Sequence, residues 1–530
     1  MDAKNAILQG KTALGIEFGS TRIKSVLVDY DGTVLAIGIH DWENQLINDI
    51  WTYDLEDAKK GLQSCYASLC DDIKKRYGLT APQTIGAIGI SAMMHGYIPF
   101  STHQLAPFQT WRNTNTSAAA EKLTDLLNFN IPLRWSSAHL YQRILDGEEH
   151  VKEITSVFTL AAYVHFLLTG EKVIGIGDAS GMFPIDSNTL DYDAEMADKF
   201  DKLISEAGYS LKIREVFPKV LTAGQNAGFL TDEGAKLLDP SGSLKPGIPF
   251  CPPEGDAGTG MTATNSVAPR TGNLSAGTST FAMIVLEHGL KKLHREIDMV
   301  TTPSGFPCAM SHANNGTTDL NAWIEIFRQF CDLMGIKAET GELFGKLYTH
   351  ALSGDADCGG LLPYGYYSGE NVTFINEGRP VFARTPSSRF NLANFMRSNL
   401  YTSLCAVKLG MDILLKDEGV KLDVMTGHGG LFKTPLVMQK ILAAAVNSPV
   451  TVMSTAGEGG AWGIALLAAY TADGKKSGRL EDYLNERVFK NLKGEAVYPD
   501  PEDVKGFEIF TGRYVKGLEI EKAAINSMDW

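Results

Sequence analysis

Paired cysteines, long apolar runs and an excess of positive charge are all missing from this sequence of 530 residues. The seven cysteines are odd in number and never have the C-x-x-C spacing, which argues against both a disulfide framework and a zinc site. A reducing cytoplasm is therefore the expected compartment. No stretch of about 20 apolar residues is free of charge, so neither a signal peptide nor a membrane span is predicted.

The charge balance excludes two classes of partner. With 48 basic and 62 acidic residues the formal net charge is −14, and an acidic surface repels both nucleic acid and anionic membranes. A small anion would need a local positive site. The hydrophobic fraction of 44% and the charged fraction of 21% are typical of soluble globular chains, and the length predicts two or more domains.

The N-terminal region predicts a β-β-β-α-β unit. Short apolar runs at 13–18, 23–30 and 33–39 are separated by Gly-Ser-Thr and Asp-Gly turns, which is typical of three antiparallel strands. Apolar residues then recur at helical spacing from Leu55 to Tyr77, and the run at 85–91 reads as a compact buried strand.

A similar pattern restarts near residue 270, which predicts two related lobes. The segment 272–280 leads into a second apolar strand, helical stretches follow at 318–334 and 392–415, and a strand beginning at Leu422 precedes a helix at 433–447. Since the glycines of the two similar turns, Gly19 and Gly277, lie half a chain apart, this is no short-period solenoid. We expect an α/β protein with two lobes facing a cleft.

A segment rich in proline and glycine, 240–269, is the expected boundary between the lobes, because few of its residues favour regular structure. The predicted domains are therefore 1–265 and 266–530. Residues beyond about 475 are charged and weakly periodic, and we expect them to form a peripheral appendage on the second lobe.

The two similar turns are candidate phosphate cradles. A glycine followed by hydroxyl residues can present backbone N–H groups to an anion without a bulky side chain in the way. A single such motif is more often an ordinary hairpin turn, but its duplication favours phosphate binding. The residues concerned are Gly19, Ser20 and Thr21 in the first turn, and Gly277, Thr278 and Ser279 in the second. Lys24 is a further candidate, with a solvated surface charge as the alternative.

A glycine-rich loop at 427–430 follows an apolar strand and precedes Lys433 and a helix. Such a loop suits close approach of backbone to a nucleotide base or ribose, and Gly429, Gly430 and Lys433 are the candidates. A loop without a ligand is the alternative. The motif at 457–463 is a second glycine-rich segment ahead of a predicted helix. It is a further candidate for such a loop, and a role in tight packing alone is the alternative.

Asp256 is the candidate general base. It lies between glycines in the motif at 254–260, ahead of the second lobe's phosphate turn. A carboxylate at such a place could take a hydroxyl proton as the oxygen attacks a γ-phosphoryl group. For an isolated Gly-Asp pair, a simple turn is the alternative.

Three polar clusters carry groups that hydrogen-bond polyols, at 91–96, 110–116 and 312–319. Each is also compatible with a polar loop, and His95 and His312 taken singly are more often structural. No His, Cys and carboxylate grouping has the spacing of a metal site. Together with the other motifs, the clusters indicate a sugar pocket.

With these motifs assembled, the sequence resembles the FGGY family of carbohydrate kinases over roughly residues 13 to 470. The matching segments are GIEFGSTRIK, MMHG, WRNTNT, Asp178 to Gly181, EGDAGTG, SAGTS, PYGYYSGE and GHGGLFKTPLVMQKILAA. The resemblance implies a two-lobed actin-like ATPase fold (ribonuclease H-like) with a duplicated β-β-β-α-β-α core around an interlobe cleft.

The resemblance also assigns roles. It implies that Asp256 is the catalytic base, that the two turns hold the phosphates of ATP, and that the glycines of the 427–430 loop and Lys433 lie near adenosine. Glu17, with Asp256, would hold Mg²⁺, which offsets phosphate charge in an acidic protein. Met94, His95 and Asn113 match positions that line the family's sugar pocket.

The sequence departs from the family pattern at three positions: Glu17 stands where Asp is usual, and Asn113 and Asn115 stand where Asp and Arg are usual. Several segments resemble ribulokinase- and xylulokinase-like enzymes, and we expect phosphorylation of L-ribulose to L-ribulose 5-phosphate. A D-xylulose kinase and a non-catalytic actin-like protein that binds sugar or nucleotide are the alternatives. For assembly, a homodimer is the base-rate expectation.

Overall fold

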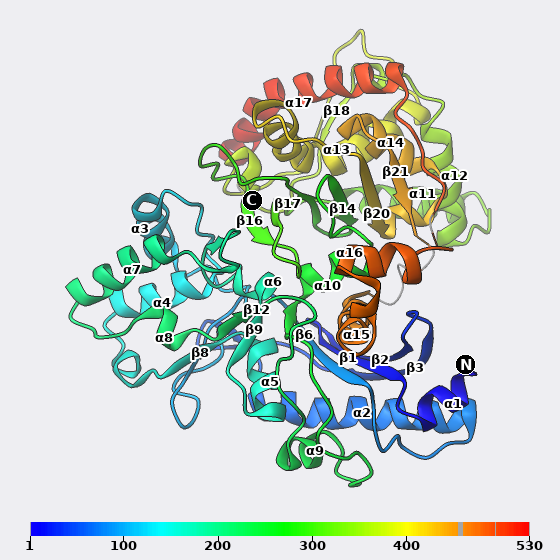
Figure 1. The fold of residues 1–530 in the computed structure, drawn as a ribbon. Coiled ribbons are helices and arrows are strands. Elements are labelled where there is room, and N and C mark those ends of the chain that lie inside the picture. The colour runs from blue at the N-terminus through cyan, green and yellow to red at the C-terminus, as the bar shows by residue number, and fades with distance from the viewer. Residues whose placement is uncertain (1, 454–458, 493, 529–530) are drawn as a thin grey trace. The chain divides into compact units, whose positions relative to one another are not determined.

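A computed structural model describes residues 2–453, 459–492 and 494–528 of the chain (Figure 1). It separates into two compact units, each assembled from three chain segments. The first unit comprises 1–268, 298–308 and 457–492, and the second comprises 269–297, 309–456 and 493–530. The first crossing, between 268 and 269, lies close to the predicted boundary at 265/266, and the segments 298–308 and 457–492 belong to the first unit.

The sheet of the first unit has the order β13-β6-β1-β2-β3. Its strands are β1 (Thr12–Phe18), β2 (Arg22–Asp29), β3 (Val34–Asp41), β6 (Ala87–Ala92) and β13 (Glu254–Gly255). The first three are antiparallel, whereas β6 runs parallel to β1. In the sequence α2 (Leu55–Tyr77) lies between β3 and β6, after two short strands that form a sheet of their own. For the strands of this sheet and α2, the predicted β-β-β-α-β order is confirmed.

Two helices, α2 and α15 (Gly459–Ala472), cover opposite faces of this sheet (Figure 1). Glycines make the close approach possible on both sides. A Cβ on Gly15 of β1 would lie 2.3 Å from the carbonyl oxygen of Ala461, and one on Gly38 of β3 would lie 2.2 Å from that of Cys65. Since something must move to admit even a methyl group, these strand glycines are packing requirements.

Shorter elements complete the first unit. They are α1 (Ala3–Leu8), β4 (Gln45–Ile47), β5 (Ile50–Thr52), β7 (Ile98–Phe100), α3 (Ser117–Leu127), α4 (Ser136–Leu145), β8 (Ser156–Phe158), α5 (Leu160–Thr169), β9 (Val173–Gly175), α6 (Ile176–Ala179), β10 (Ile185–Asp186), β11 (Asp191–Tyr192), α7 (Ala194–Glu206), α8 (Ile213–Val216), β12 (Lys219–Leu221), α9 (Asp232–Leu238), α10 (Asp256–Ala263), β16 (Asp298–Thr301) and α16 (Leu480–Tyr483).

The second unit repeats the same arrangement, with strands in the order β17-β15-β14-β20-β21. Here β14 (Thr271–Ala276) pairs antiparallel with β15 (Thr280–Val285) and parallel with β20 (Val424–Gly429), as β1 pairs with β2 and β6. The remaining elements are α11 (Thr318–Leu333), α12 (Thr340–Ala351), β17 (Pro307–Ala313), β18 (Leu362–Tyr364), β19 (Val381–Ala383), α13 (Leu392–Asp412), α14 (Val437–Val446), β21 (Val450–Val452) and α17 (Pro501–Ser527). The α/β class and the internal duplication are confirmed.

The segment beyond 475 is divided between the units. Residues up to 492 belong to the first unit, whereas α17 is a 27-residue helix of the second. Phe507, Phe510 and Tyr514 recur at helical spacing and are fully buried, and the Phe507 ring stacks on Tyr401 of α13 at 4.1 Å. This part of the expected appendage is therefore a core helix of its unit.

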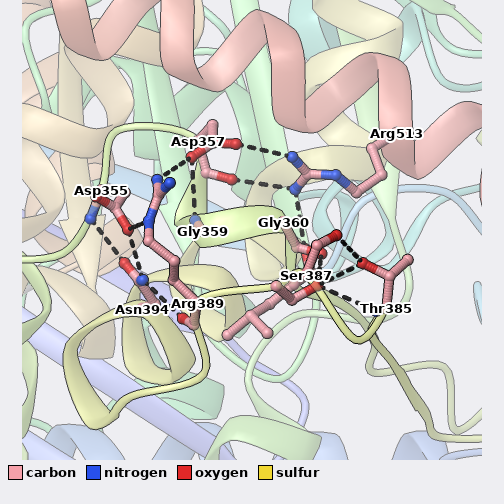
Figure 2. Close-up of polar contacts among 11 residues, drawn as sticks. Asp355, Asp357, Gly359, Gly360, Thr385, Ser387, Arg389, Asn394 and Arg513 are labelled. Carbon is pink, nitrogen blue, oxygen red and sulfur yellow. Dashed lines mark hydrogen bonds and ion pairs between the residues drawn. The ribbon is translucent and has the colours of Figure 1, made fainter.

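A polar network fixes the next turn of α17. Arg513 donates to the carbonyl oxygens of Asp357 and Leu361 and pairs with the Asp357 carboxylate at 3.0 Å. Figure 2 shows this guanidinium facing Asp357, while Arg389 reaches Asp355 on the other side of the same loop. The arginines thus tie the helix and a surface loop to one short segment before β18.

Candidate active site

The residues predicted for the site fall into two groups, one in each unit. The first unit holds Glu17, the turn at 19–21, Lys24, Met94, His95, Asn113 and Asp256. The second holds the turn at 277–279, Gly429, Gly430 and Lys433. Most of these residues lie at the carboxyl ends of the central parallel strands of their own sheet, the usual position for ligands in α/β proteins. Asn113 is different, because it lies in the loop between β7 and α3.

Asp256 is the first residue of α10, directly after the short strand β13. Its side chain is exposed to solvent, and its Oδ1 accepts a hydrogen bond from the backbone N–H of Met94 at 3.0 Å. Desolvation by the surrounding protein raises the pKa of this carboxyl, while the Met94 hydrogen bond acts in the opposite direction. Asp256 is therefore an oriented, accessible carboxylate.

Gly255, directly before Asp256, lies too close to neighbouring side chains to carry a side chain of its own. A Cβ on Gly255 would lie 2.8 Å from Cγ of Met94 and 3.1 Å from Oδ1 of Asp178. Met94 itself follows the end of β6, so β6 and β13, which are parallel neighbours, deliver Met94 and Asp256 to the same edge. The Gly-Asp pair is thus a strand-to-helix junction packed against Met94.

Glu17 lies near the end of β1 and accepts a hydrogen bond from the backbone N–H of Ala461, in the first turn of α15, at 3.0 Å. Burial, and then the nearby charge of Asp256, raise its pKa to about 7, while Lys24 lowers it. Glu17 and Asp256 are thus close enough to influence one another's ionisation. A cation between them would relieve that repulsion.

Lys24 is the strand partner of Glu17 across the β1–β2 hairpin. It is half-buried and favours the ionised form of Glu17. Its observed electrostatic partner is this carboxylate, and a contact with phosphate stays a prediction.

The first turn leaves its amide groups available. The carbonyl oxygen of Gly19 accepts from the Trp42 indole at 2.7 Å, that of Ser20 from the Tyr53 hydroxyl at 2.7 Å, and that of Thr21 from the Trp42 backbone at 3.2 Å. Within the described part of the chain, the N–H groups of Ser20 and Thr21 have no hydrogen-bond partner. Two free amides on a braced turn are suited to hold an anion.

The second turn has the same design. The carbonyl oxygens of Gly277 and Thr278 accept from the backbone N–H groups of Thr317 and Gly316, at 3.0 and 2.8 Å. Across the residues that the structure covers, nothing accepts from the N–H groups of Thr278 and Ser279. The turns differ by one residue, because β1 and β2 pair from Phe18 to Ile23 whereas β14 and β15 pair from Ala276 to Thr280.

The loop after β20 lies beside the second turn, because Gly429 is the parallel strand partner of Ala276. Gly429 has φ of 98°, and a Cβ there would lie 2.4 Å from the Ala276 carbonyl oxygen, so only glycine suits this position. A Cβ on Gly430 would meet nothing within 4 Å. Gly430 and Lys433 are both exposed at this edge, which leaves room for the predicted nucleotide contact.

The three residues predicted to contact the sugar differ in how many of their polar groups already form hydrogen bonds within the protein. Met94 is buried, and its N–H is used by Asp256. His95 is also buried, has φ of 72°, and its Nδ1 lies 3.3 Å from the Gly181 carbonyl oxygen. The Asn113 amide accepts from the Trp51 N–H at 2.9 Å and donates to the Trp51 and Thr110 carbonyls at 2.8 and 3.0 Å. Asn113 therefore has a structural role, and sugar contact stays a prediction.

The asparagines of the third polar cluster also have internal partners. Asn314 and Asn315 hold Glu370 and the loop before it, with Asn314 N–H donating to Glu370 at 2.9 Å and Asn315 Oδ1 accepting from Tyr367 N–H at 2.9 Å. The glycines of the 457–463 motif are partly outside the described residues. Among the glycines of this motif that the structure describes, Gly463 makes the closest approach: a Cβ there would lie 2.0 Å from the Thr259 carbonyl oxygen. This supports the alternative that the motif serves tight packing, here of α15 on α10.

Two buried carboxyl groups behind Asp256 were not predicted as site residues. Asp178 accepts from Thr159 Oγ1 at 2.6 Å, and Glu254 accepts from the N–H groups of Gly177 and Asp178 at 3.2 and 2.9 Å. Burial raises their pKa values to about 7 and about 8. The segment from Asp178 to Gly181, one of those that resemble the family, was the only sequence signal for Asp178. The burial of its carboxyl group could not be inferred from the neighbouring residues.

In the described residues, no cluster of three or more His, Cys, Asp or Glu side chains is arranged to hold a metal ion. Over the same residues, the structure contains no helix both long and apolar enough to cross a membrane.

Two family models match the chain: the N-terminal domain of the FGGY family of carbohydrate kinases over residues 12–261, and the C-terminal domain of that family over 272–472. The protein therefore belongs to the FGGY family of carbohydrate kinases, which are ATP-dependent phosphotransferases with an alcohol group as acceptor. No curated protein sequence matches the chain.

Solved structures share the fold. A xylulose kinase from Lactobacillus acidophilus is 17% identical with a TM-score of 0.77, covering 97% of this chain and 99% of that one. A xylulose kinase from Rhodospirillum rubrum is 18% identical with a TM-score of 0.76, covering 96% and 99%. A glycerol kinase from Plasmodium falciparum, solved with ADP, is 15% identical with a TM-score of 0.74, covering 96% and 98%. The two-domain actin-like architecture expected from the sequence is confirmed.

Proposed function

We propose that the protein phosphorylates a ketopentose at its primary hydroxyl, with Asp256 as the general base and L-ribulose as the substrate, which yields L-ribulose 5-phosphate. One observation carries the proposal: Asp256 is accessible to solvent and its Oδ1 is held at 3.0 Å by the N–H of Met94. A base for phosphoryl transfer must be both oriented and reachable by the acceptor hydroxyl.

In this mechanism the Met94 N–H fixes one oxygen of Asp256, and the other, Oδ2, receives the proton. As the sugar oxygen bonds to the γ-phosphorus of ATP, its O–H bond breaks and the proton passes to Oδ2. The bond between the γ-phosphorus and the bridging oxygen breaks, and ADP leaves. The raised pKa of Asp256 favours its role as acceptor, because the carboxylate binds the proton more readily than an ordinary aspartate does.

The two turns supply the phosphate contacts. The free N–H groups of Ser20 and Thr21 and those of Thr278 and Ser279 are the donors we assign to ATP phosphates. Their carbonyl oxygens are already held by other groups, so the amides are oriented before the nucleotide binds. Gly429, Gly430 and Lys433 are assigned to adenosine.

The donor set near Asp256 fits Mg²⁺. This ion usually takes one or two protein carboxylates and completes its shell with phosphate oxygens and water, and Glu17 beside Asp256 provides such a pair. We propose that Glu17 and Asp256 hold it. When bound, Mg²⁺ offsets the charge of the ATP phosphates. The longer side chain of Glu17 is compatible with this role because Ala461 N–H holds it in place.

The test is ADP release from Mg-ATP with matched concentrations of L-ribulose, D-ribulose, D-xylulose, L-xylulose, L-fuculose, L-rhamnulose and glycerol. L-Ribulose is expected to exceed all others. Asp256→Asn is expected to lower kcat by about 10²–10⁴ while nucleotide binding is kept. Asp232→Asn is the matched control, because Asp232 is also the first residue of a helix and exposed. Near-normal turnover by the Asp256 variant would refute the assignment.

D-Xylulose is the second candidate substrate, favoured by the xylulose kinases among the structural relatives. A dominant response to D-xylulose in the same assay would select it. Nucleotide binding without any acceptor above the no-sugar control would favour a non-catalytic actin-like protein. For the location of the enzyme we propose the cytoplasm, because all seven cysteines are free thiols.

A further inference from the structure

A cavity of about 530 Å³ lies in the first unit, and none of the residues assigned above lines it. Its walls come from β8, β11, α7, the α8–β12 segment and Lys172, which directly precedes β9. The labels of β8, β9, α7, α8 and β12 lie on one flank of this unit in Figure 1. Ligand pockets for small molecules range from about 300 to 1,000 Å³, so the volume suits a metabolite.

Three cations at this cavity have no acidic partner. Lys172 and Lys219 adjoin, because the Lys219 N–H donates to the Lys172 carbonyl at 3.0 Å where β12 pairs with β9. Lys172 Nζ donates to Ser156 Oγ at 2.7 Å. Throughout the described residues, neither Lys172, Arg214 nor Lys219 forms an ion pair, and all three are exposed. By contrast, the fourth cation, Lys212, pairs with Glu215 at 3.5 Å.

Carboxylates face the same cavity and keep hydrogen-bond capacity. Asp191 uses Oδ1 to accept from Tyr192 N–H at 2.8 Å, and Asp201 uses Oδ1 to accept from Ile213 N–H at 2.9 Å. Asp198, on the exposed side of α7, lines the cavity as well. Each ionised carboxylate can accept several hydrogen bonds, so the remaining oxygens are suited to the hydroxyl groups of a polyol.

The floor of the cavity is aromatic. Phe158, Tyr192 and Phe217 are buried, and the rings of Tyr192 and Phe217 lie edge to face at 5.9 Å. Such a surface packs against the C–H face of a sugar ring or chain. Unpaired cations, hydroxyl acceptors and an apolar floor therefore occur together in one cavity.

We propose that this cavity is a second ligand site that binds a sugar phosphate. The phosphate contacts Lys172, Arg214 and Lys219, where charge-assisted hydrogen bonds are strongest. The sugar hydroxyls donate to Asp191, Asp198 and Asp201. The site is independent of Asp256 and of the identity of the acceptor sugar.

Isothermal titration with D-ribose 5-phosphate, in the absence of nucleotide, tests the site. Arg214→Ala/Lys219→Ala is expected to weaken binding at least 10-fold, because two of the three phosphate contacts are lost. Lys199→Ala/Lys202→Ala is the matched control, since these exposed lysines of α7 pair with Glu195 and Glu206 and do not line the cavity. The control is expected to bind like the wild type.

Free D-ribose and inorganic phosphate are titrated separately, and each is expected to bind at least 10-fold more weakly than D-ribose 5-phosphate. Equal affinity in the Arg214/Lys219 variant and the wild type would place the ligand elsewhere, including the site of Asp256, and would overturn the proposal. So would absence of binding to the wild type. Should the double variant fail to fold, Arg214→Gln alone is subject to the same comparison. Because no turnover is measured, failure here leaves the kinase assignment intact.

Discussion

The carboxylate of Glu17 accepts a hydrogen bond from the backbone N–H of Ala461 at 3.0 Å, although the two residues are 444 positions apart. The contact joins the end of β1 to the first turn of α15, where the helix dipole favours a negative charge. Burial and Asp256 nevertheless raise the pKa of Glu17 to about 7. A cation close to Glu17 would therefore favour its ionised form.

This arrangement predicts a metal-dependent phenotype for Glu17→Gln. The glutamine oxygen can still accept from Ala461 N–H, so folding is expected to be unchanged, but the charge offered to Mg²⁺ is lost. We expect the Mg²⁺ concentration for half-maximal ADP release to rise about 10- to 100-fold. Glu43→Gln, at an exposed position of the same unit, is the control. A Glu17 variant with the wild-type Mg²⁺ dependence would contradict the role.

A second prediction concerns Gly460 of α15, whose lack of a side chain leaves room for the Glu17 carboxylate. A Cβ on Gly460 would lie 2.2 Å from Glu17 Oε1 and 2.8 Å from Thr259 Oγ1. Gly460→Ala is therefore expected to lower the free energy of unfolding by about 1–3 kcal/mol, measured by urea denaturation. Gly260→Ala, at a helical glycine with nothing within 4 Å of its Cβ, is expected to be neutral or stabilising. Equal stabilities for the two variants would rule out the steric account.

Local patterns predicted the N-terminal elements well. Runs of apolar residues between turns gave β1 to β3, and helical spacing gave α2 with both ends in place. The duplicated turns are likewise local features. What makes them suited to phosphate, however, is the bracing of their carbonyls by Trp42 and Tyr53, or by Gly316 and Thr317, and these contacts depend on tertiary structure.

The return of 298–308 and 457–492 to the first unit could not be predicted in the same way. Nearly every residue of α15 is apolar and buried, so its sequence does not indicate which of the two sheets it packs against. The periodicity of Phe507, Phe510 and Tyr514 was a usable signal for α17, but the surrounding charges obscured it. Asn113 shows a further limit of prediction from sequence. Its match to a family position indicated contact with a ligand, whereas in the structure its side-chain amide bonds backbone groups of Trp51 and Thr110.

Asn113 yields the third prediction. Its Nδ2 donates to the carbonyl oxygens of Trp51 and Thr110, and only 3% of the residue is exposed. Asn113→Asp would place a carboxylate oxygen against two carbonyls, and we expect a loss of about 1–3 kcal/mol in the free energy of unfolding. Asn115 is exposed, so Asn115→Arg is expected to stay within about 0.5 kcal/mol of the wild type. A fully stable Asn113→Asp protein would show that the amide bridge is dispensable.

The fourth prediction concerns pH. Glu254 is 1% exposed, and burial, followed by the charge of Asp178, raises its pKa from 4.5 to about 8. Between these values the folded protein holds a proton that the unfolded chain has released, so the free energy of unfolding falls as the pH rises. The contribution of Glu254 is complete below about pH 4.5 and is lost by about pH 8. Buried His139 and His165, whose pKa values are lowered to about 3 and about 4, act in the opposite direction only below about pH 6.5.

Urea denaturation between pH 6.5 and 8.5 therefore avoids the titration of these histidines. Glu254→Gln imitates the protonated side chain at every pH, so its free energy of unfolding is expected to decline less steeply than that of the wild type, by at most about 1.4 kcal/mol per pH unit. Glu17 titrates in both proteins, and its effect cancels in the comparison to first order. The coupling between Asp178 and Glu254 is part of the difference that the comparison measures. Glu233→Gln, at an exposed position on α9, controls for the loss of one charge. Parallel pH profiles for the Glu254 variant and the wild type would mean that Glu254 is ionised in the folded protein, and its two backbone donors, Gly177 and Asp178, would then outweigh its burial.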